Sequence, residues 1–327
     1  MEVVWKNIKF KYIFACILTT FVISCLISIS PMSIDECKCE VTTQTSQYNN
    51  HRQEGNLVRA RKKSSGHHLA ILVPFRDRFE ELLIFAQHMK MFLDKQNINY
   101  HIFILNQVDR FRFNRASLIN VGFLETNKEF DYIAIHDVDL LPINDELLYW
   151  FPNKGPYHVS SPDLHPRYHY PTFVGGILLI KREHFIQVNG MSNKYWGWGL
   201  EDDEFYVRLK EAGLNVVRPQ NISTGTHNTF KHIHDRNHRK RDMIKCYNQR
   251  EVTRKRDRQT GLNNVSYRIL DTIKMTIGDT SLTVLNISLM CDKTSTPWCE
   301  CDKVIGSKDG KSKEKKKMNN NKSATGL

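Results

Sequence analysis

The chain has 327 residues and carries 47 Lys and Arg residues against 35 Asp and Glu residues, a formal net charge of +12. Apolar residues make up 40% and charged residues 25%, a globular composition that excludes a wholly disordered chain. Eight cysteines are too few for a small protein built around disulfides. The length predicts one large domain or two small ones.

The first predicted element is a transmembrane anchor at residues 12–30, which contain no charged side chain. At helical rise this stretch spans about 28 Å, close to the hydrocarbon thickness of a bilayer. Lysines precede it and acidic residues follow it, so the positive-inside rule leaves residues 1–11 in the cytosol. A cleaved signal peptide is the alternative, but Ser30 to Met32 is a poor cleavage site. We expect an uncleaved signal anchor and a single-pass type II membrane protein.

Residues 31–67 are polar, lack apolar periodicity and are expected to form a lumenal stem. Glycosylation sequons agree with a lumenal body; they lie at Asn221, Asn264 and Asn286, with a further one at Asn321. The cysteines agree as well, because four of them gather near the C-terminus: Cys246, Cys291, Cys299 and Cys301. They could form two disulfides in an oxidising compartment. The alternative is a zinc site, although the one-residue spacing of the last two differs from the usual C-x-x-C pattern.

Residues 68–301 are predicted to form one catalytic domain in which strands and helices alternate. Short apolar runs predict strands at 69–73, 102–105, 132–135 and 174–180, the last with Gly175 and Gly176 inside it. Helices are predicted at 79–94, after Asn114 as a cap, and at 201–212. This order indicates an α/β sheet with ligands at the carboxyl ends of its strands. Residues 302–327 hold eight lysines and three acids and predict a disordered basic tail.

Three clusters of unusual residues carry candidate chemistry. Asp137 and Asp139 directly follow a predicted strand, where two carboxylates could hold Mg²⁺ or Mn²⁺; an Asp-rich turn is the alternative. Residues 196–204 interleave two tryptophans with glycines and then run into four acids, more than a helix start needs. One of these acids could be a general base for a hydroxyl. His232 and His234 alternate on an extended segment and could bind a metal, or could be a surface pair.

Basic and cap residues complete the candidates. Residues 231–258 hold eleven Lys and Arg against four acids, either a solvated helix face or a surface for an acidic ligand. Arg76 and Arg78 end the first strand and could hold a phosphate or a base, or be ordinary surface arginines. Residues 113–116 begin a helix whose free N–H groups favour an anion, or serve as a simple cap.

Taken together, these motifs resemble the β-1,4-galactosyltransferase family. The segments 74–78, 113–116, 137–139, 173–176 and 196–203 occur there in this order, and the resemblance covers roughly residues 68–260. It implies a GT-A glycosyltransferase fold, a Rossmann-like mixed sheet flanked by helices, with Mn²⁺ as cofactor and UDP-galactose as donor. His232-Ile-His234 replaces the Met-x-x-His arrangement of other members. By this feature the chain resembles the family member that transfers galactose, with inversion, to the 4-hydroxyl of β-xylose on the serine of a proteoglycan core protein.

The resemblance also assigns roles, position by position. Asp202 would be the catalytic base, with Asp137 and Trp198 also taking part in catalysis, the latter on a closing loop. The implied metal ligands are Asp139, His232 and His234. The implied donor-binding residues are Pro74, Arg76, Arg78, Phe113, Arg115, Asp137, Val138, Trp198 and His234. The implied acceptor-binding residues are Tyr168, Tyr170, Gly199, Glu201, Asp202 and Asp203. The implied disulfides are Cys246–Cys301 and Cys291–Cys299. Leu200 lies at a position that varies in the family, and we assign it no role.

Other functions are weaker expectations. The same fold could use UDP-GalNAc as donor, or act on N-acetylglucosamine or another terminal sugar. A non-catalytic sugar-binding member would be expected to lack Asp202 or a metal ligand, and all of them are present. Nucleic-acid binding is not expected, because the body is predicted to be lumenal and the basic tail lacks aromatic residues. The expected location is the Golgi membrane, and the expected partners are UDP-galactose and a xylosylated core protein.

Overall fold

The structure, a computed structural model, describes residues 18–20, 66–126, 128–234 and 239–301. The expected cytosolic segment, nearly all of the anchor and stem, and the basic tail lie outside these ranges. Of the anchor, residues 18–20 are described, and they are helical. None of the helices in the described ranges is both long enough and apolar enough to cross a membrane. The sheet and the helices around it belong to residues 60–327, the second of the two units into which the chain divides.

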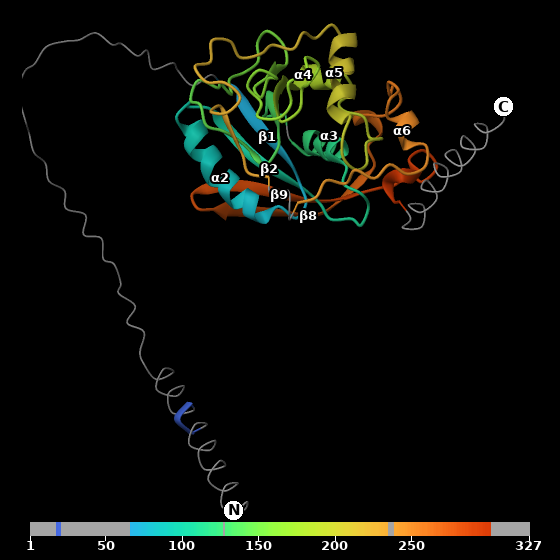
Figure 1. Cartoon of the computed structure of the whole chain (residues 1–327), viewed down its shortest axis with the longest axis horizontal. Coiled ribbons are helices and arrows are strands. Elements are labelled where there is room, and N and C mark those ends of the chain that lie inside the picture. The colour runs from blue at the N-terminus through green and yellow to red at the C-terminus, as the bar shows by residue number, and fades with distance from the viewer. Residues whose placement is uncertain (1–17, 21–65, 127, 235–238, 302–327) are drawn as a thin grey trace, which may run out of the picture. The chain divides into compact units, whose positions relative to one another are not determined.

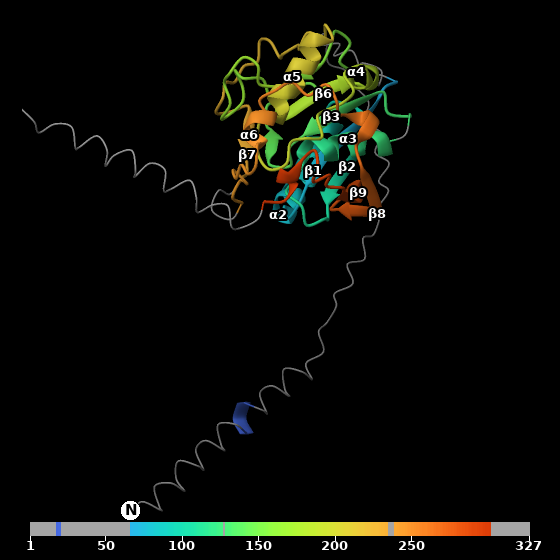
Figure 2. The ribbon, with the colours of Figure 1, turned by 90° about the vertical axis from the view of Figure 1, so that its right-hand side faces the viewer.

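A seven-stranded mixed sheet forms the centre of this unit (Figures 1 and 2), with the strand order β5-β6-β3-β1-β2-β9-β8. Its strands are β1 (His68–Phe75), β2 (Asn99–Gln107), β3 (Tyr132–His136), β5 (Tyr157–His158), β6 (Ile177–Lys181), β8 (Tyr267–Ile277) and β9 (Thr280–Leu289). The pairs β3–β1, β1–β2 and β2–β9 are parallel, whereas β6 and β8 run antiparallel to their neighbours. A separate two-stranded sheet joins β4 (Leu140–Pro142) to β7 (Phe230–His232).

Helices cover both faces of the sheet because both faces of its central strands are apolar. In β1, Leu69, Ile71 and Val73 face α2 (Phe79–Asp94), while Ala70 and Leu72 pack with the opposite layer. That layer contains α3 (Arg115–Glu125), α4 (Arg182–Gln187) and α5 (Glu201–Glu211). The short helix α6 (Gln249–Val252) and the 3₁₀ turns Leu262–Asn264 and Pro297–Cys299 complete the described helical elements. The first turn of α3 carries Arg115, and the first turn of α5 carries Glu201, Asp202 and Asp203.

The structure corrects the predicted strand at 174–180. The strand begins at Ile177, and both glycines precede it. Gly176 has a φ of 76°, a conformation that an L-residue adopts only with strain. The Ser160 hydroxyl accepts from the Ile177 amide and donates to the Gly175 carbonyl, so a side-chain contact replaces a strand pairing at this point. The predicted helix at 201–212 ends one residue earlier, at Glu211.

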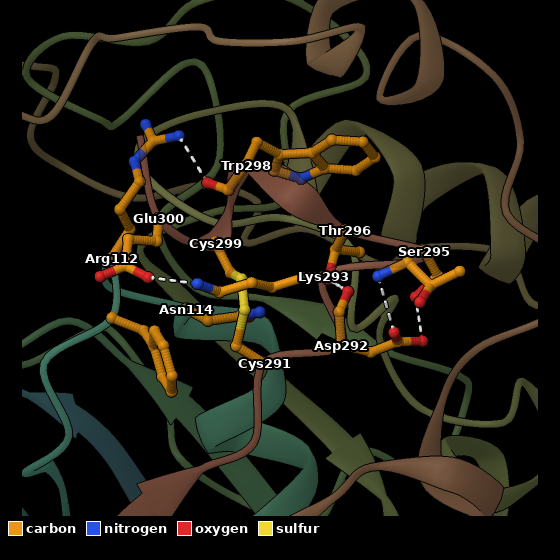
Figure 3. Close-up of a disulfide and its surroundings, with 12 residues drawn as sticks. Arg112, Asn114, Cys291, Asp292, Lys293, Ser295, Thr296, Trp298, Cys299 and Glu300 are labelled. Carbon is orange, nitrogen blue, oxygen red and sulfur yellow. Dashed lines mark hydrogen bonds and ion pairs between the residues drawn. A yellow bond between two sulfur atoms is a disulfide. The ribbon is translucent and has the colours of Figure 1, made fainter. Parts of the chain in front are cut away.

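The C-terminal cysteines form two disulfides, Cys246–Cys301 and Cys291–Cys299, with Cα atoms 5.9 and 6.0 Å apart. These are the pairings implied by the family resemblance, and they leave none of the four cysteines free to bind zinc. Figure 3 shows the second bridge beside Arg112 and Asn114. The basic segment 231–258, which contains Cys246, does not form the continuous helix face that was one of its two interpretations. In its described part only α6 is helical.

Candidate active site

Arg115 brings two predicted site carboxylates together. Asn114 caps α3 by accepting a hydrogen bond from the Ser117 amide, and this fixes Arg115 as the first residue of the helix. The Arg115 guanidinium donates through Nε to Asp137 Oδ1 at 2.9 Å and through Nη1 to Asp202 Oδ1 at 2.8 Å. Asp137 directly follows β3 and Asp202 lies in the first turn of α5. The guanidinium therefore holds the ends of a strand and a helix in one constellation.

Burial sets the electrostatics of this constellation. It lowers the pKa of Arg115, but the charges of Asp137 and Asp202 outweigh it and raise that pKa overall. For Asp202, burial raises the pKa, Arg115 opposes the rise, and Asp137 adds to it. Burial and the charge of Asp202 raise the pKa of Glu201 to about 7. A carboxylate whose pKa is raised is a stronger proton acceptor, as a general base for a hydroxyl requires.

The turn before β6 leaves room for the Asp202 carboxylate. A Cβ atom at Gly175 would lie 2.3 Å from Asp202 Oδ2 and 2.6 Å from the Phe173 ring. Behind this turn, His158 Nε2 lies 2.8 Å from the Gly175 carbonyl, a hydrogen-bond distance. Residues 173–176 thus form the surface that the Asp202 carboxylate contacts. This contact gives a structural reason for the motif at 173–176, to which the sequence alone assigned no role.

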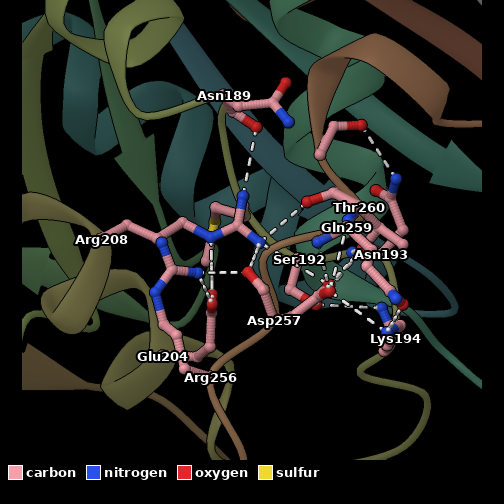
Figure 4. A network of polar contacts seen from close by, with 12 residues as sticks. Asn189, Ser192, Asn193, Lys194, Glu204, Arg208, Arg256, Asp257, Gln259 and Thr260 are labelled. Atoms are coloured by element: carbon pink, nitrogen blue, oxygen red, sulfur yellow. Dashed lines mark hydrogen bonds and ion pairs between the residues drawn. The ribbon is translucent and has the colours of Figure 1, made fainter. Parts of the chain in front are cut away.

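A buried polar network fixes α5, the helix that carries Asp202 (Figure 4). Arg208 donates through Nε to Glu204, one turn earlier, and through Nη2 to the backbone carbonyls of Asp257 and Thr260. The Asp257 carboxylate accepts from the Ser192 hydroxyl at 2.6 Å and forms an ion pair with Lys194 at 3.1 Å. The helix is therefore held by charged groups along its length, with its acidic first turn at the site.

Asp139 and the two predicted histidines come together through the pairing of β4 with β7. Leu140 pairs with His232, and the Ile233 amide donates to the Asp139 carbonyl. His234 Nδ1 lies 3.1 Å from Asp139 Oδ2, and His232 Nε2 lies 3.9 Å from Asp139 Oδ1. Burial and the charge of Asp137 raise the pKa of Asp139 to about 6, and burial and Arg167 lower the pKa of His232 to about 4.

This donor set fits a divalent cation. One carboxylate and two imidazoles held in the neutral, metal-binding form suit an ion such as Mn²⁺, which would also relieve the crowding of Asp137 and Asp139. Within the described ranges, no three His, Cys, Asp or Glu side chains already stand in the geometry of a metal site. The three side chains would therefore adjust their orientations around an ion, and the metal assignment remains a prediction.

The predicted donor-binding residues occupy two places. Arg78 lies at the metal group, with Nη1 3.2 Å from His234 Nδ1 and 3.2 Å from Glu81 Oε1. Arg76 lies apart from it and donates to the backbone carbonyls of residues 107, 109 and 111, with its guanidinium 5.8 Å from the Phe113 ring centre. Arg76 therefore shapes the segment after β2. Pro74 lies within β1, and Val138 is buried between the two aspartates.

Trp198 is 38% exposed, and residues 242 and 245 hold its backbone. Its amide donates to the Asp242 carbonyl and its carbonyl accepts from Lys245 Nζ, both at 2.9 Å. The Arg241 guanidinium lies 4.7 Å from the Trp198 ring and 5.9 Å from the Tyr168 ring. Sequence reasoning treated Arg241 and Lys245 only as part of a basic run, because no motif marks them.

The predicted acceptor-binding residues lie around the first turn of α5. The hydroxyl of Tyr170 forms a hydrogen bond with Asp203, and burial, with the nearby carboxylates, raises the pKa of Tyr170. Gly199 has a φ of 103° and open space around it. Glu201 Oε2 is buried and lacks a hydrogen-bond partner in the described part of the chain. Such an acceptor is suited to a ligand hydroxyl.

The three predicted glycosylation sites differ in their surroundings. Asn221 and Asn264 are exposed. Asn286 lies within β9, half-buried between two strands, and its Oδ1 accepts from the Asn106 side chain at 2.9 Å. Folding therefore leaves Asn286 less accessible than the other two asparagines, which a sequon alone does not reveal.

Comparison with known proteins adds independent evidence. Residues 27–152 match the N-terminal region of glycosyl transferase group 7, and residues 155–233 match the family described as the N-terminal domain of galactosyltransferase. The chain is 65% identical to β-1,4-galactosyltransferase 7 of Drosophila melanogaster, over 73% of this chain and 74% of that protein. It is 49% identical to xylosylprotein 4-β-galactosyltransferase of Caenorhabditis elegans, over 73% of this chain and 84% of that protein.

Two solved structures agree in fold. The catalytic domain of Drosophila β-1,4-galactosyltransferase 7 in complex with xylobiose has a TM-score of 0.72 and 65% identity, covering 72% of this chain and 100% of that one. A mutant of the same enzyme, in complex with manganese, UDP-Gal and xylobiose, has a TM-score of 0.72 and 64% identity over the same shares. The mixed sheet is thus a GT-A-like glycosyltransferase fold, and the chain belongs to the β-1,4-galactosyltransferase family.

Proposed function

We propose that this chain transfers galactose from UDP-galactose to the 4-hydroxyl of β-xylose on a proteoglycan core protein, with inversion and with Mn²⁺ as cofactor. The observation that carries the proposal is the 64% identity to an enzyme crystallised with manganese, UDP-Gal and xylobiose. The contacts among Asp202, Arg115 and Asp137, beside the Asp139 group, support it, because a candidate base would then act next to a candidate metal site.

In this proposal Asp139, His232 and His234 hold the metal, and Arg78 adds a positive charge beside His234. The ion supplies Lewis-acid stabilisation for a diphosphate leaving group. Phe113, Pro74 and Val138 line the donor side, while Arg76 orders the segment that presents Phe113. His232 ends β7, and Asp139 and His234 lie directly beside the paired strands β4 and β7, so the group rests on a paired backbone.

The chemistry on the acceptor side falls to the first turn of α5. Asp202 takes the proton from the attacking hydroxyl, and Arg115 orients its carboxylate and favours its ionised form. One displacement inverts the anomeric carbon, so the chain needs no nucleophile of its own. Glu201 and Asp203 are placed to bind acceptor hydroxyls, while Tyr168, Tyr170 and Trp198 offer aromatic surfaces to sugar rings.

The proposal extends to the placement of the protein. Residues 12–30 serve as a signal anchor and residues 31–67 as a stem, with residues 68–301 as the catalytic domain and residues 302–327 as a tail without catalytic role. Two disulfides support an oxidising compartment, and the exposed sequons at Asn221 and Asn264 agree with it. We place the catalytic domain in the Golgi lumen, on a single-pass type II chain.

The test is galactose transfer from radiolabelled UDP-galactose by the full chain in detergent with Mn²⁺. A β-xyloside and a β-N-acetylglucosaminide are offered side by side, with Asp202→Asn as the inactive control. Transfer to xylose alone, lost in Asp202→Asn, is the expected result. Transfer to N-acetylglucosamine would keep the family mechanism and refute the acceptor, and preference for UDP-GalNAc in donor competition would refute the donor.

A further inference from the structure

Arg112, just before the cap of α3, is a buried hub outside the constellation described above. Its side chain is 10% exposed, and its backbone amide donates to the Cys299 carbonyl. Its guanidinium donates through Nε to Asp242 Oδ2 at 2.6 Å and through Nη2 to the Ile244 carbonyl at 2.6 Å. Nη1 reaches three further acceptors, the Gln249 side chain, the Trp298 carbonyl and Cys301 Sγ. Figure 3 shows the contact with Trp298.

These contacts surround the segment that carries Trp198. A Cβ atom at Gly197 would lie 2.0 Å from Arg112 Nη2, so the glycine rests directly on the guanidinium. Gln249, which Arg112 holds through Oε1, donates through Nε2 to the Trp196 carbonyl at 2.8 Å. Asp242, which Arg112 holds through its carboxylate, accepts the Trp198 amide through its backbone carbonyl.

Arg112 thereby connects three parts of the chain that are distant in sequence. On one side is the disulfide-linked C-terminal segment, through Trp298 and Cys301; on another is the segment 242–249. Arg112 joins both to the Trp196–Trp198 segment, directly at Gly197 and through Gln249 and Asp242 at the two tryptophans. A planar guanidinium is suited to this task because it offers several donors in a fixed fork, whereas a lysine offers one compact charge.

We propose that Arg112 is a positioning residue that fixes the Trp196–Trp198 segment for acceptor binding by tying it to the disulfide-linked segment 291–301. The proposal rests on the function proposed above, since it assigns the Trp198 segment to the acceptor. It is distinct from the role of Arg115, because Arg112 contacts neither Asp137 nor Asp202 among its hydrogen-bond and ion-pair partners in the described residues.

Arg112→Lys in the full chain tests the proposal, with Arg182→Lys as the matched control. Arg182 also donates to backbone carbonyls, at Phe123 and Thr126, and lies 4.2 Å from the Phe123 ring, and its partners in the described part of the chain include no site residue. We expect the KM for the xyloside to rise about tenfold in Arg112→Lys, with the KM for UDP-galactose within about twofold of wild type. Arg182→Lys should match wild type in both constants.

Hydrogen exchange without substrate separates this proposal from the proposed function. The Gly197 amide donates a hydrogen bond to the Phe113 carbonyl, and the Trp198 amide donates one to the Asp242 carbonyl. The exchange rates of these two amides therefore measure how firmly the segment is held. Their exchange should accelerate about tenfold in Arg112→Lys and stay unchanged in Arg182→Lys. If wild type transfers galactose to a different acceptor, the proposed function fails, and the exchange result still decides the role of Arg112.

Two further variants keep the test decisive. Asp242→Asn weakens one of the contacts of Arg112 and should give the same changes at smaller size; it replaces Arg112→Lys if that variant does not fold. Gly197→Ala places a methyl group against the guanidinium, so its effect on exchange should be non-additive with that of Arg112→Lys. Unchanged exchange and xyloside KM in Asp242→Asn and Arg112→Lys, or equal effects of Arg182→Lys, would overturn the proposal.

Discussion

Because Gly175 has no side chain, the Asp202 carboxylate can lie directly against its backbone. Asp202 Oδ2 occupies the space that a Cβ atom at this residue would fill. The opposite carboxylate oxygen bonds to Arg115, so the group is fixed from two sides. A shift of a fraction of an ångström in a base is large for a reaction that depends on near-attack geometry.

Gly175→Ala is therefore expected to lower kcat/KM for galactose transfer by about 10- to 100-fold, because the methyl group displaces the Asp202 carboxylate. Steady-state kinetics measures the effect, and circular dichroism checks that the variant folds. Gly225→Ala is the control, since a Cβ atom there meets nothing within 4 Å. Equal activity of the two variants would show that the position of Asp202 does not limit the reaction.

Sequence reasoning found the individual residues of the site better than their connections. Asp137, Asp139, Trp198 and Asp202 stand out because they lie in dense, unusual motifs at predicted strand and helix ends. Arg112 lies in a phenylalanine-flanked stretch with no motif of its own, and its partners are 130 and more positions away. Contacts of that kind arise from tertiary packing and leave no local pattern.

Among the elements, α5 shows how polar contacts hold a helix that carries acidic site residues in its first turn. Arg208 is buried in the helix and contacts Glu204 and the carbonyls of two other segments. Asp257 faces the same network and accepts hydrogen bonds from Ser192, Thr260 and the Gln259 amide. Burial would raise the pKa of Asp257, but these donors and Lys194 lower it to about 2.

Asp257→Asn is expected to lower the free energy of unfolding at pH 7 by about 1–2 kcal/mol. The pKa of Asp257 in the folded state lies below its unfolded value, so its carboxylate stabilises the fold above about pH 4. That stabilisation is lost as the pH falls toward 2, and the difference between wild type and variant should close there. Urea unfolding at pH 7, 4 and 2.5 measures it.

Asp271→Asn, on the exposed face of β8, is the matched control and should change stability little at any of these pH values. A difference between wild type and Asp257→Asn that persists unchanged at pH 2.5 would mean that the amide disrupts packing rather than removing a charge.

Buried elements were predicted more accurately from the sequence than exposed ones. The strands β1 and β3 and the helix α2 were predicted closely because their apolar residues are continuous or recur at helical spacing. The hairpin β8–β9 was missed, since β8 is an edge strand with charged residues such as Arg268 and Lys274 interrupting its apolar pattern. The strand β6 was predicted to begin at residue 174 instead of 177, because Gly175 and Gly176 lie between apolar residues. The sequence does not show that Ser160 contacts the backbone at this point.

At the scale of the whole molecule, the two disulfides close chain segments of very different length. Cys246 and Cys301 are 55 positions apart, whereas Cys291 and Cys299 are 8 apart. In the chain-entropy account, a bridge stabilises by restricting the unfolded chain, and the longer segment gains more. The bridge between Cys246 and Cys301 also connects the residues just before α6 to the last described residue of the chain, next to Arg112.

Replacing both Cys246 and Cys301 by Ser should cost about 4 kcal/mol of unfolding free energy, and replacing Cys291 and Cys299 about 2.5 kcal/mol. Urea unfolding in non-reducing buffer compares the two double variants. The reverse order would show that local packing around Trp298 and Cys299, both buried, outweighs the restriction of the unfolded chain.

The position of β9 in the sheet has a consequence for biosynthesis. Asn106 of β2 contacts Asn286 of β9 across the sheet, 180 positions apart in the sequence. While the chain emerges from the ribosome, β1, β2 and β3 can pair early, but the outer edge of β2 stays open until almost the whole domain has been synthesised. An open, apolar strand edge is a template for wrong pairing. The edge of β2 in the nascent protein is therefore open to wrong pairing for a long interval, until β9 is available to cover it.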